Sequence, residues 1–435
     1  IRLHLRPGET FVIIYSAKAG TYIWALPQQG DAAYHISRLD GNEIGKIVAA
    51  LRGALAPDKS AALGNLPPFD TALAYELYKQ ILQPVAAAWK DSPHLLIAAS
   101  GPLAQLPFSL LPVEKSNTEK ENILFSSYRR VPWLIRRHTV TMLPTVASFL
   151  SLRALPAGDP SRKAFIGFGD PLFNPAQMEA GKEEKAAGKK LNGSGLTLRG
   201  VRITAQGGID DHKTASLQLE NLNRLPDTSD EILEIAAILK ADLRKDVFLG
   251  KDASREQVTS RPLTERQVIA FATHALVPGD LDGLDQPALA LSSPLITGNP
   301  ADGLLTMSDI MRLKLDADWV VLSACSTGAA EGVGSEALSG LGRAFFYAGT
   351  RSVLASMWPV ETTSAKKLVS GVFRHQQTGR EISRSRALQK AMLNLIDDAH
   401  LIDPVTGKVA ASYAHPLFWA PFVLVGDPGG NVNAD

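Results

Sequence analysis

Two residues that could act together as a nucleophile and a base follow apolar segments of the chain. His274 follows QVIAFAT (Gln267–Thr273), and Cys325 follows WVVLS (Trp319–Ser323) and one alanine. Both segments are typical of buried parallel strands, and in open α/β sheets the reactive groups lie just past the carboxyl ends of strands. If the two strands are parallel, both residues emerge at the same edge of the sheet. We therefore expect the imidazole and the thiol to share one cleft.

A thiol beside an imidazole predicts nucleophilic catalysis. The thiolate is the attacking form, and a free thiol with a pKa of about 8.5 is mostly protonated at neutral pH. A nearby imidazole can accept the thiol proton. A stretch of small residues follows Cys325 up to Ser335. It leaves backbone N–H groups free, and we predict that those of Cys325 and Ala275 form an oxyanion hole.

Each residue also has a structural interpretation. Alone, His274 is typical of a hydrogen-bonded structural histidine, and Cys325 of a core residue at the end of a strand. It is their combination with the small-residue turn after the cysteine that favours catalysis.

Composition excludes several other functions. Lys and Arg number 45 against 44 Asp and Glu, so net charge gives no support to nucleic-acid or membrane-surface binding. The single cysteine can form neither an intrachain disulfide nor a thiolate zinc site, and no HExxH pair is present. No apolar run approaches the roughly 18 residues of a spanning helix. We expect no cofactor, no metal and a cytoplasmic protein. The chain begins with Ile1 rather than Met, which indicates a fragment or a processed product.

The pattern along the chain changes near residue 160. Strand-like segments such as Phe11–Tyr15 and two helical patterns dominate the first part, whereas short apolar strands alternate with amphipathic helices from Ala164 onward. That alternation predicts an α/β fold with a mostly parallel sheet covered on both faces. A polar insertion at about 175–218 is predicted to be a mobile loop, either a gating element or a tolerated surface insertion.

Five segments resemble landmarks of the CHAT family, which comprises bacterial caspase-like domains associated with tetratricopeptide repeats. They occur along the chain in the order expected for the family. The longest is VVLSACSTGAAEGVGSEALSGLGRAFFYAGTRSVLASMWPV (Val320–Val360), which contains Cys325, and FATHALVPGDLDGLDQPALALS (Phe271–Ser292) contains His274. The other three are Gly101–Pro112, Gly167–Phe173 and His415–Pro428. In addition, Cys325 follows His274 by 51 positions, close to the roughly 50 that are typical of caspases.

The resemblance implies a caspase–hemoglobinase-like sandwich and a cysteine endopeptidase that acts through a thioester intermediate. Carried over to this chain, His274 is the base and Cys325 the nucleophile. It also implies a catalytically silent lobe at 1–155 and a catalytic lobe at 156–435. Family analogy places Ser356, Met357 and Trp358 near the first specificity pocket, on a strand edge along which an extended peptide can pair.

The resemblance also implies a context. Members of the family commonly carry helical repeats before this domain, which would lie upstream of Ile1. Such repeats would couple proteolysis of a protein substrate to a regulatory protein partner, often in bacterial defence or regulated proteolysis.

One residue departs from the wider caspase-like pattern. Many such enzymes have glycine after the histidine, where this chain has Ala275. Alanine would be strained at a positive φ and harmless at a negative one. We expect a negative φ.

Two other functions remain open. The same fold could serve as a non-cleaving signalling module that binds partners. Alternatively, Gly332, Gly334 and Gly340 could belong to a nucleotide loop of an α/β enzyme, although GVGSEALSG does not directly follow a strand and no Walker A motif is present.

Overall fold

The computed structural model describes residues 1–56, 63, 66–116, 122–186, 218–323, 325–326, 333–378, 382–403 and 406–430. For 182–186, 325–326, 333–339 and 378 it describes the backbone alone. The described residues form two compact units. Ile1–Ala157 and the residues from Thr363 onward make up the first, and those between Gly158 and Thr362 make up the second.

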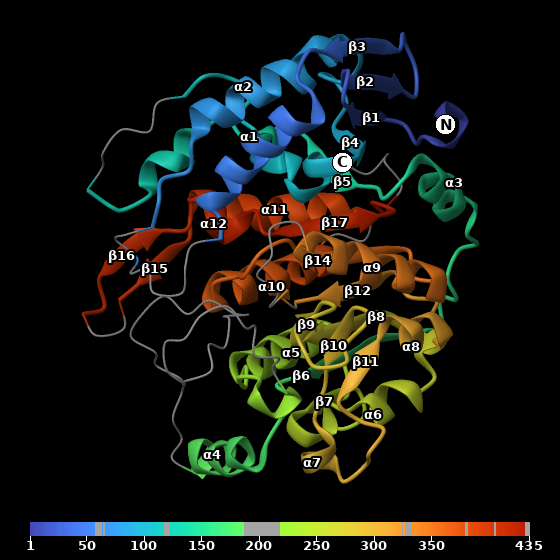
Figure 1. The fold of residues 1–435 in the computed structure, drawn as a ribbon, viewed down its shortest axis with the longest axis vertical. Coiled ribbons are helices and arrows are strands. Elements are labelled where there is room, and N and C mark those ends of the chain that lie inside the picture. The colour runs from blue at the N-terminus through green and yellow to red at the C-terminus, as the bar shows by residue number, and fades with distance from the viewer. Residues whose placement is uncertain are drawn as a thin grey trace. The chain divides into compact units, whose positions relative to one another are not determined.

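The first unit combines the N-terminal and C-terminal parts of the chain around one sheet (Figure 1). The strands in this sheet follow the order β3-β2-β1-β4-β5-β17, and β1, β4, β5 and β17 are mutually parallel. The elements of this unit are β1 (Glu9–Ala17), β2 (Gly20–Pro27), β3 (Ala33–Ser37), α1 (Gly41–Gly53), α2 (Thr71–Ile81), β4 (His94–Ala99), β5 (Thr139–Met142), α3 (Val146–Ala154), α10 (Thr362–Thr378), α11 (Arg384–Asp397), β15 (His400–Ile402), β16 (Val409–Ser412), α12 (Pro416–Trp419) and β17 (Phe422–Gly426).

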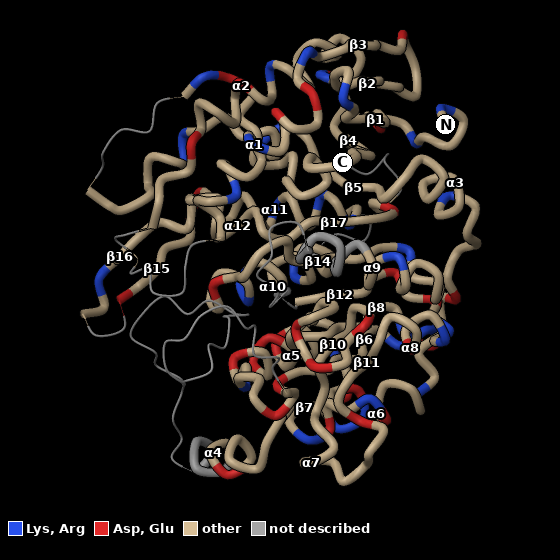
Figure 2. The backbone as a smooth tube through the Cα atoms, in the orientation of Figure 1, with Lys and Arg blue, Asp and Glu red and all other residues tan. Residues whose placement is uncertain are grey.

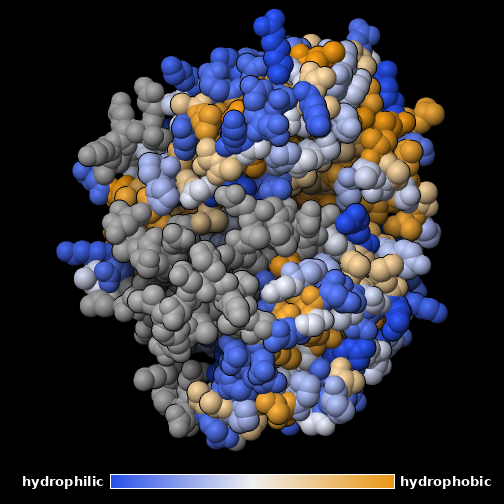
Figure 3. Space-filling view, in the orientation of Figure 1, coloured by the Kyte–Doolittle hydropathy of each residue, from blue (hydrophilic) through white to orange (hydrophobic). Residues whose placement is uncertain are grey.

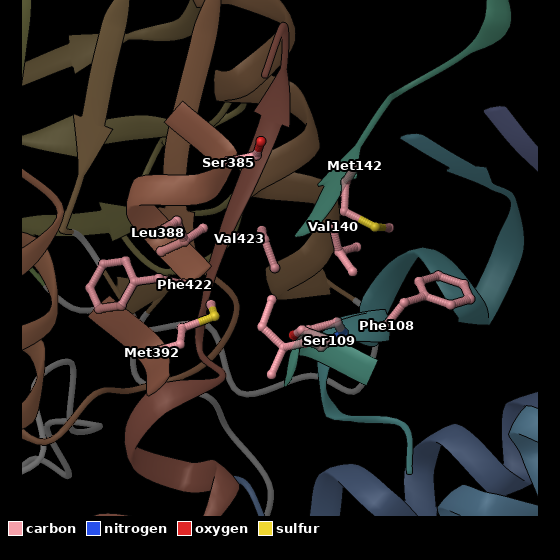
Figure 4. A pocket seen from close by; sticks show the side chains of 11 residues that line it. Phe108, Ser109, Val140, Met142, Ser385, Leu388, Met392, Phe422 and Val423 are labelled. Carbon is pink, nitrogen blue, oxygen red and sulfur yellow. The ribbon is translucent and has the colours of Figure 1, made fainter. Parts of the chain in front are cut away.

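Packing inside this unit is mainly apolar. Val140 and Met142 of β5, Leu388 and Met392 of α11, and Val423 of β17 surround a small hollow (Figure 4). Its lining offers few polar groups, whereas ligand sites combine an apolar wall with several convergent polar groups. The hollow is therefore a packing feature of the core.

On the face of the protein that Figure 3 shows, hydrophilic side chains predominate and apolar ones gather near the N-terminal strands.

The second unit is built on an all-parallel sheet. Its strands follow the order β14-β12-β8-β6-β7, and every neighbouring pair is parallel. The elements of this unit are β6 (Lys163–Gly169), α4 (Pro175–Ala186), α5 (Asp227–Ile238), β7 (Val247–Leu249), α6 (Arg255–Thr259), β8 (Arg266–Ala272), β9 (His274–Leu276), β10 (Ala288–Ala290), α7 (Pro294–Thr297), β11 (Leu304–Thr306), α8 (Met307–Arg312), β12 (Trp319–Leu322), β13 (Cys325–Ser326), α9 (Val333–Ala348) and β14 (Ser352–Ser356).

Helices cover both faces of the parallel sheet. Ile166 and Phe168 of β6 share a core cluster with Phe345 of α9, which places α9 over one face. Gly167 and Gly169 point to the other face, where a Cβ atom on either would come within 3.0 Å of the Ile232 side chain of α5. The two glycines therefore allow α5 to pack closely against the sheet.

A second, four-stranded sheet continues from the ends of β8 and β12. Its order is β11-β10-β9-β13. After β8 a single residue precedes β9, and after β12 two residues precede β13. The Ser323 N–H donates to the Phe271 carbonyl (3.0 Å), which keeps the two chains paired as they leave the parallel sheet.

The predicted α/β class, with a mostly parallel sheet and helices on both faces, is confirmed. The predicted loop at about 175–218 is wrong at its start, because Pro175–Ala186 forms the helix α4. The Asn174 side chain accepts from the Gln177 N–H (3.0 Å) and so caps that helix, and Ala, Glu and Lys favour the helical state. The part of this segment at 187–217 lies outside the described residues.

The predicted boundary at residue 155 separates a silent lobe (1–155) from a catalytic lobe (156–435). By contacts, the residues from Thr363 onward belong to the same unit as the N-terminal strands. The assignment of catalysis to one lobe stays a prediction. Within the described part of the chain, no helix combines the length and the apolar character needed to cross a bilayer.

A buried histidine of the first unit predicts acid sensitivity. Burial lowers the pKa of His415 to about 3, although a backbone hydrogen bond at Pro67 opposes the shift. A folded-state pKa below the unfolded value near 6.5 means that stability is lost as the pH falls below 6.5. Between about pH 7 and about pH 5, the neutral variant His415→Gln should therefore lose about 2 kcal/mol less stability than wild type.

Urea unfolding of both proteins at the two pH values measures this difference. Equal losses in wild type and variant would contradict the assignment of a buried, neutral His415.

Candidate active site

Three neighbouring strands of the second unit, β8, β12 and β14, end within one residue of the same row. Phe271, Leu322 and Ala355 are paired across β8, β12 and β14. His274 and Cys325 each lie three residues beyond this row. The carboxyl ends of these parallel strands therefore deliver both sequence-predicted residues to one edge of the sheet, as expected from the two apolar segments.

Cys325 and His274 are directly paired in register. Strands β13 and β9 are parallel neighbours, with Cys325 opposite His274 and Ser326 opposite Ala275. Neighbouring strands lie about 4.8 Å apart, and residues opposite one another in register belong to the same face of a sheet. The backbone thus places the thiol-bearing and imidazole-bearing residues side by side on one face.

The His274 imidazole is buried and held in one orientation. Only 2% of the residue is exposed, and its Nε2 lies 2.7 Å from the backbone carbonyl oxygen of Asn223. A carbonyl only accepts, so Nε2 carries the proton in the neutral ring and Nδ1 carries the lone pair. Nδ1 is buried and has no hydrogen-bond partner among the described residues. The ring therefore has a basic nitrogen available for a thiol.

Burial also sets the charge state of the ring. It lowers the pKa of His274, while the Asn223 carbonyl and the carboxylate of Asp227 act in the opposite direction. Asp227 lies in the first turn of α5, among the acidic residues visible along this helix (Figure 2). The net lowering of the pKa keeps the imidazole neutral, which is the form that a general base requires.

Packing on one face of the four-stranded sheet fixes the ring plane. The rings of Phe173 and His274 lie 5.8 Å apart, and Phe173 belongs to an apolar cluster with Leu222 and Leu276. Leu276 lies two residues after His274 on β9, hence on the same face of the sheet. The imidazole is therefore enclosed by apolar groups on the side of Phe173, which accounts for its desolvation.

Ala275 is compatible with the backbone at its position. Among the described non-glycine residues, a positive φ occurs at Phe125, Asp170 and Lys240 and not at Ala275. The alanine that replaces the expected glycine is therefore unstrained. Its role as an oxyanion donor stays a prediction, and so does that of the Cys325 N–H.

The predicted substrate-binding residues follow β14. Ser356 is the last residue of this strand and is buried, Trp358 is 3% exposed, and Met357 between them is half-buried. Like His274 and Cys325, Trp358 lies three residues beyond the paired row of strand ends. The three residues thus reach the same edge as the candidate dyad, and their contact with substrate stays a prediction.

Sequence patterns missed the groups that orient the imidazole. The Asn223 carbonyl gives no signal, because every residue has one. Phe173 stands four residues after the end of β6 and is typical of core packing. Asp170 follows β6 directly. It could have been found by the same rule that identified His274, namely a polar residue past the carboxyl end of a buried strand.

No cluster of metal ligands accompanies the dyad in the part of the chain that the structure describes. Groups of three or more His, Cys, Asp or Glu side chains with suitable geometry for a metal are absent there. Among the described side chains of this edge, His274 can accept a proton at Nδ1.

Comparison with known proteins gives matches to a family and to individual relatives. The CHAT domain matches residues 71–427, which is most of the chain. Among curated proteins, the human tetratricopeptide repeat protein 28 is 27% identical over 207 residues. That match covers 41% of this chain and 8% of the human protein, so the chain spans less than a tenth of that relative.

Two solved structures of the Saccharomyces cerevisiae separase–securin complex also match. The first has 10% sequence identity and the second 11%, and both have a TM-score of 0.45. The matches cover 96% and 98% of this chain and 30% of the yeast chain in each case.

The tautomer and the pKa of His274 can be tested in solution. In Cys325→Ala protein, which removes coupling to the thiol, nitrogen NMR should find the proton of neutral His274 on Nε2. The ring should titrate below 6.5, because burial lowers its pKa. His274→Gln in the same background assigns the signal. A proton on Nδ1, or titration above 6.5, would contradict the geometry.

Proposed function

Because the chain belongs to the CHAT-domain family, we propose that it is a regulated cysteine endopeptidase in which His274 activates Cys325. The observation that carries this proposal is the parallel register of β9 and β13, in which the two residues face each other. Three features support it: the burial of His274, the bond from its Nε2 to the Asn223 carbonyl, and an Nδ1 that has no partner among the described residues.

In the first half of the reaction, Nδ1 of His274 removes the thiol proton of Cys325. The thiolate attacks the carbonyl carbon of the scissile peptide bond and generates a tetrahedral oxyanion. Backbone N–H groups of Ala275 and Cys325 stabilise this negative charge. As the C–N bond breaks, the imidazolium returns its proton to the leaving amine, and a thioester to Cys325 remains.

In the second half, water replaces the amine. Neutral His274 accepts a proton from the water as its oxygen attacks the thioester carbon. The C–S bond then breaks, the acid product leaves, and the proton passes back to the sulfur. The imidazolium is formed twice per cycle, and the Asn223 carbonyl and the Asp227 carboxylate both favour that charged form.

The substrate is a protein segment in extended conformation. We assign its recognition to the end of β14, with Ser356, Met357 and Trp358 near the first specificity pocket. Their position at the same edge as His274 and Cys325 supports this assignment.

Regulation by a protein partner is part of the same proposal. The human relative is named for tetratricopeptide repeats, which are helical arrays that bind other proteins. We propose that such repeats, or a separate partner, control access to the dyad. Because a catalytic thiol must stay reduced and the one cysteine can form no intrachain disulfide, we propose that the protein is cytoplasmic. From the resemblance to the CHAT family, we propose a role in bacterial defence or signalling.

One observation favours a second candidate, a non-cleaving signalling module. His274 is 2% exposed and Ala275 is 3% exposed, so the base is closed to solvent in this structure. If no partner opens the site, the same fold could serve for binding alone.

Replacement of the nucleophile tests the protease proposal. Cys325→Ala should abolish peptide-bond cleavage, because no thioester can form, and should leave the folded state nearly unchanged. Cleavage of a proteome-derived peptide library measures the loss, and circular dichroism checks the fold. Retained proteolysis at the wild-type rate would exclude Cys325 as the nucleophile.

An electrophilic peptide probe separates the two candidates. Peptidyl acyloxymethyl ketones with varied first residues should label wild-type protein at Cys325, and His274→Gln should slow labelling by about 10²-fold or more. Mass spectrometry locates the adduct. The absence of any adduct at Cys325, with or without cell extract as a source of partner, would instead favour the signalling module.

A further inference from the structure

The residue directly after β6 adopts an unusual backbone conformation. Asp170 has a φ of +51°, in the left-handed region, and is 5% exposed. Its backbone N–H donates to the Thr228 hydroxyl (2.8 Å). A non-glycine residue in this region costs free energy and persists only where its surroundings hold it, often at functional sites. Asp170 lies at the carboxyl edge of the sheet, together with the candidate dyad.

The Asp170 carboxylate is bound in a fork by Arg224. Nε of Arg224 donates to one carboxylate oxygen (2.8 Å), and Nη2 donates to the other (2.7 Å). The side chains are 7% and 16% exposed. A two-point Arg–carboxylate contact fixes orientation as well as distance. Arg224 is the neighbour in sequence of Asn223, whose carbonyl oxygen contacts His274.

Two further side chains after β6 hold the same segment. Asn174 donates to the Glu220 carbonyl (2.8 Å), and Gln177 donates to the Leu222 carbonyl (2.7 Å). Together with the Arg224 fork, they tie residues 220–224 to three side chains between the end of β6 and the first turn of α4. Asn223, whose carbonyl contacts His274, lies between two of these tied residues, Leu222 and Arg224.

We propose that Asp170 is a positioning residue, which holds Arg224 and thereby aims the Asn223 carbonyl at Nε2 of His274. Its proposed effect runs through Arg224 and Asn223, not through the thiol or the imidazole directly. It acts by fixing which ring nitrogen carries the proton and where the other one points. This inference rests on the proposed function of the dyad and explains why a charged, strained residue stands at this position.

The variant Asp170→Asn isolates the charge. Asparagine has nearly the same shape and also tolerates the left-handed region, but its amide can accept from only one arm of the Arg224 fork. The loop should therefore stay folded while residues 223–224 lose their fixed orientation. Arg224→Lys is the complementary variant, since it keeps the positive charge and removes the fork.

The second unit contains a matched control. Asp246 and Arg266 form an ion pair of similar burial, with Arg266 Nη1 2.6 Å from the carboxylate and side chains 9% and 5% exposed. Asp246 precedes β7 and Arg266 begins β8, so this pair lies at the opposite, amino edge of the parallel sheet. Asp246→Asn therefore breaks a buried ion pair without touching the imidazole.

The kinetic experiment compares these variants on a cleaved peptide or on the labelling rate of Cys325. Asp170→Asn should lower kcat and the labelling rate by about 10²-fold with little change in KM, because misplacing a catalytic group acts on the chemical step. Arg224→Lys should fall between this variant and wild type. Asp246→Asn should keep the wild-type rate per folded molecule. Equal losses in Asp170→Asn and Asp246→Asn would overturn the proposal in favour of a merely structural role.

A second measurement does not depend on protease activity. In the Cys325→Ala background, nitrogen NMR of His274 should show the Nε2 proton in the parent and in Asp246→Asn. In Asp170→Asn it should show a mixture of tautomers and faster exchange of that proton. An unchanged His274 spectrum in Asp170→Asn would overturn the positioning role, whether or not the protein cleaves peptides. A protein that neither cleaves nor labels, yet shows the tautomer change, would disprove the proposed function and keep the positioning role.

Discussion

The parallel pairing of β9 with β13 is the constraint on which the candidate site depends. Each strand continues a strand of the parallel sheet, and the register that pairs Leu322 with Phe271 also pairs Cys325 with His274. The core below the site sets this register, because β8 and β12 are buried strands and a slip of one residue would move each side chain to the opposite covered face, where it does not fit. The packing of the sheet and the pairing of His274 with Cys325 thus depend on the same register.

Burial of His274 disfavours the charged imidazole that the proposed cycle also requires, and groups close to the ring offset this effect. A desolvated imidazole is a neutral base, yet the proposed cycle forms its charged state twice. The Asn223 carbonyl and Asp227 both favour the charged form, while burial opposes it. The Asn223 carbonyl does more than the Asp227 carboxylate, because it also selects the tautomer of the ring. An imidazole that was only buried would have neither a fixed proton nor a fixed direction.

The sequence could predict the strands and the placement of His274 and Cys325 at their ends, but not the groups that orient the imidazole. Residue types and strand ends carry the first kind of information, and they placed His274 and Cys325 on neighbouring strands. The Asn223 carbonyl is 51 residues from His274 in sequence and has no side-chain signature. The Asp170–Arg224 fork joins residues 54 positions apart, and no local pattern fixes that pairing. Such contacts arise from tertiary packing, and neither periodicity nor composition shows which distant residues will meet.

The two edges of the parallel sheet carry different polar groups. At the amino edge, Arg162 and Arg351 share the carboxylates of Asp316 and Asp318. At the carboxyl edge, Nδ1 of His274 lacks a partner among the described residues, and the backbone near it adopts a strained conformation. Unsatisfied and strained groups cost stability and persist where they serve a reaction. Nε of Arg266 at the amino edge also lacks a partner among the described residues, so it is the combination of the unpartnered Nδ1 with the left-handed Asp170 that supports the proposed chemistry at the carboxyl edge.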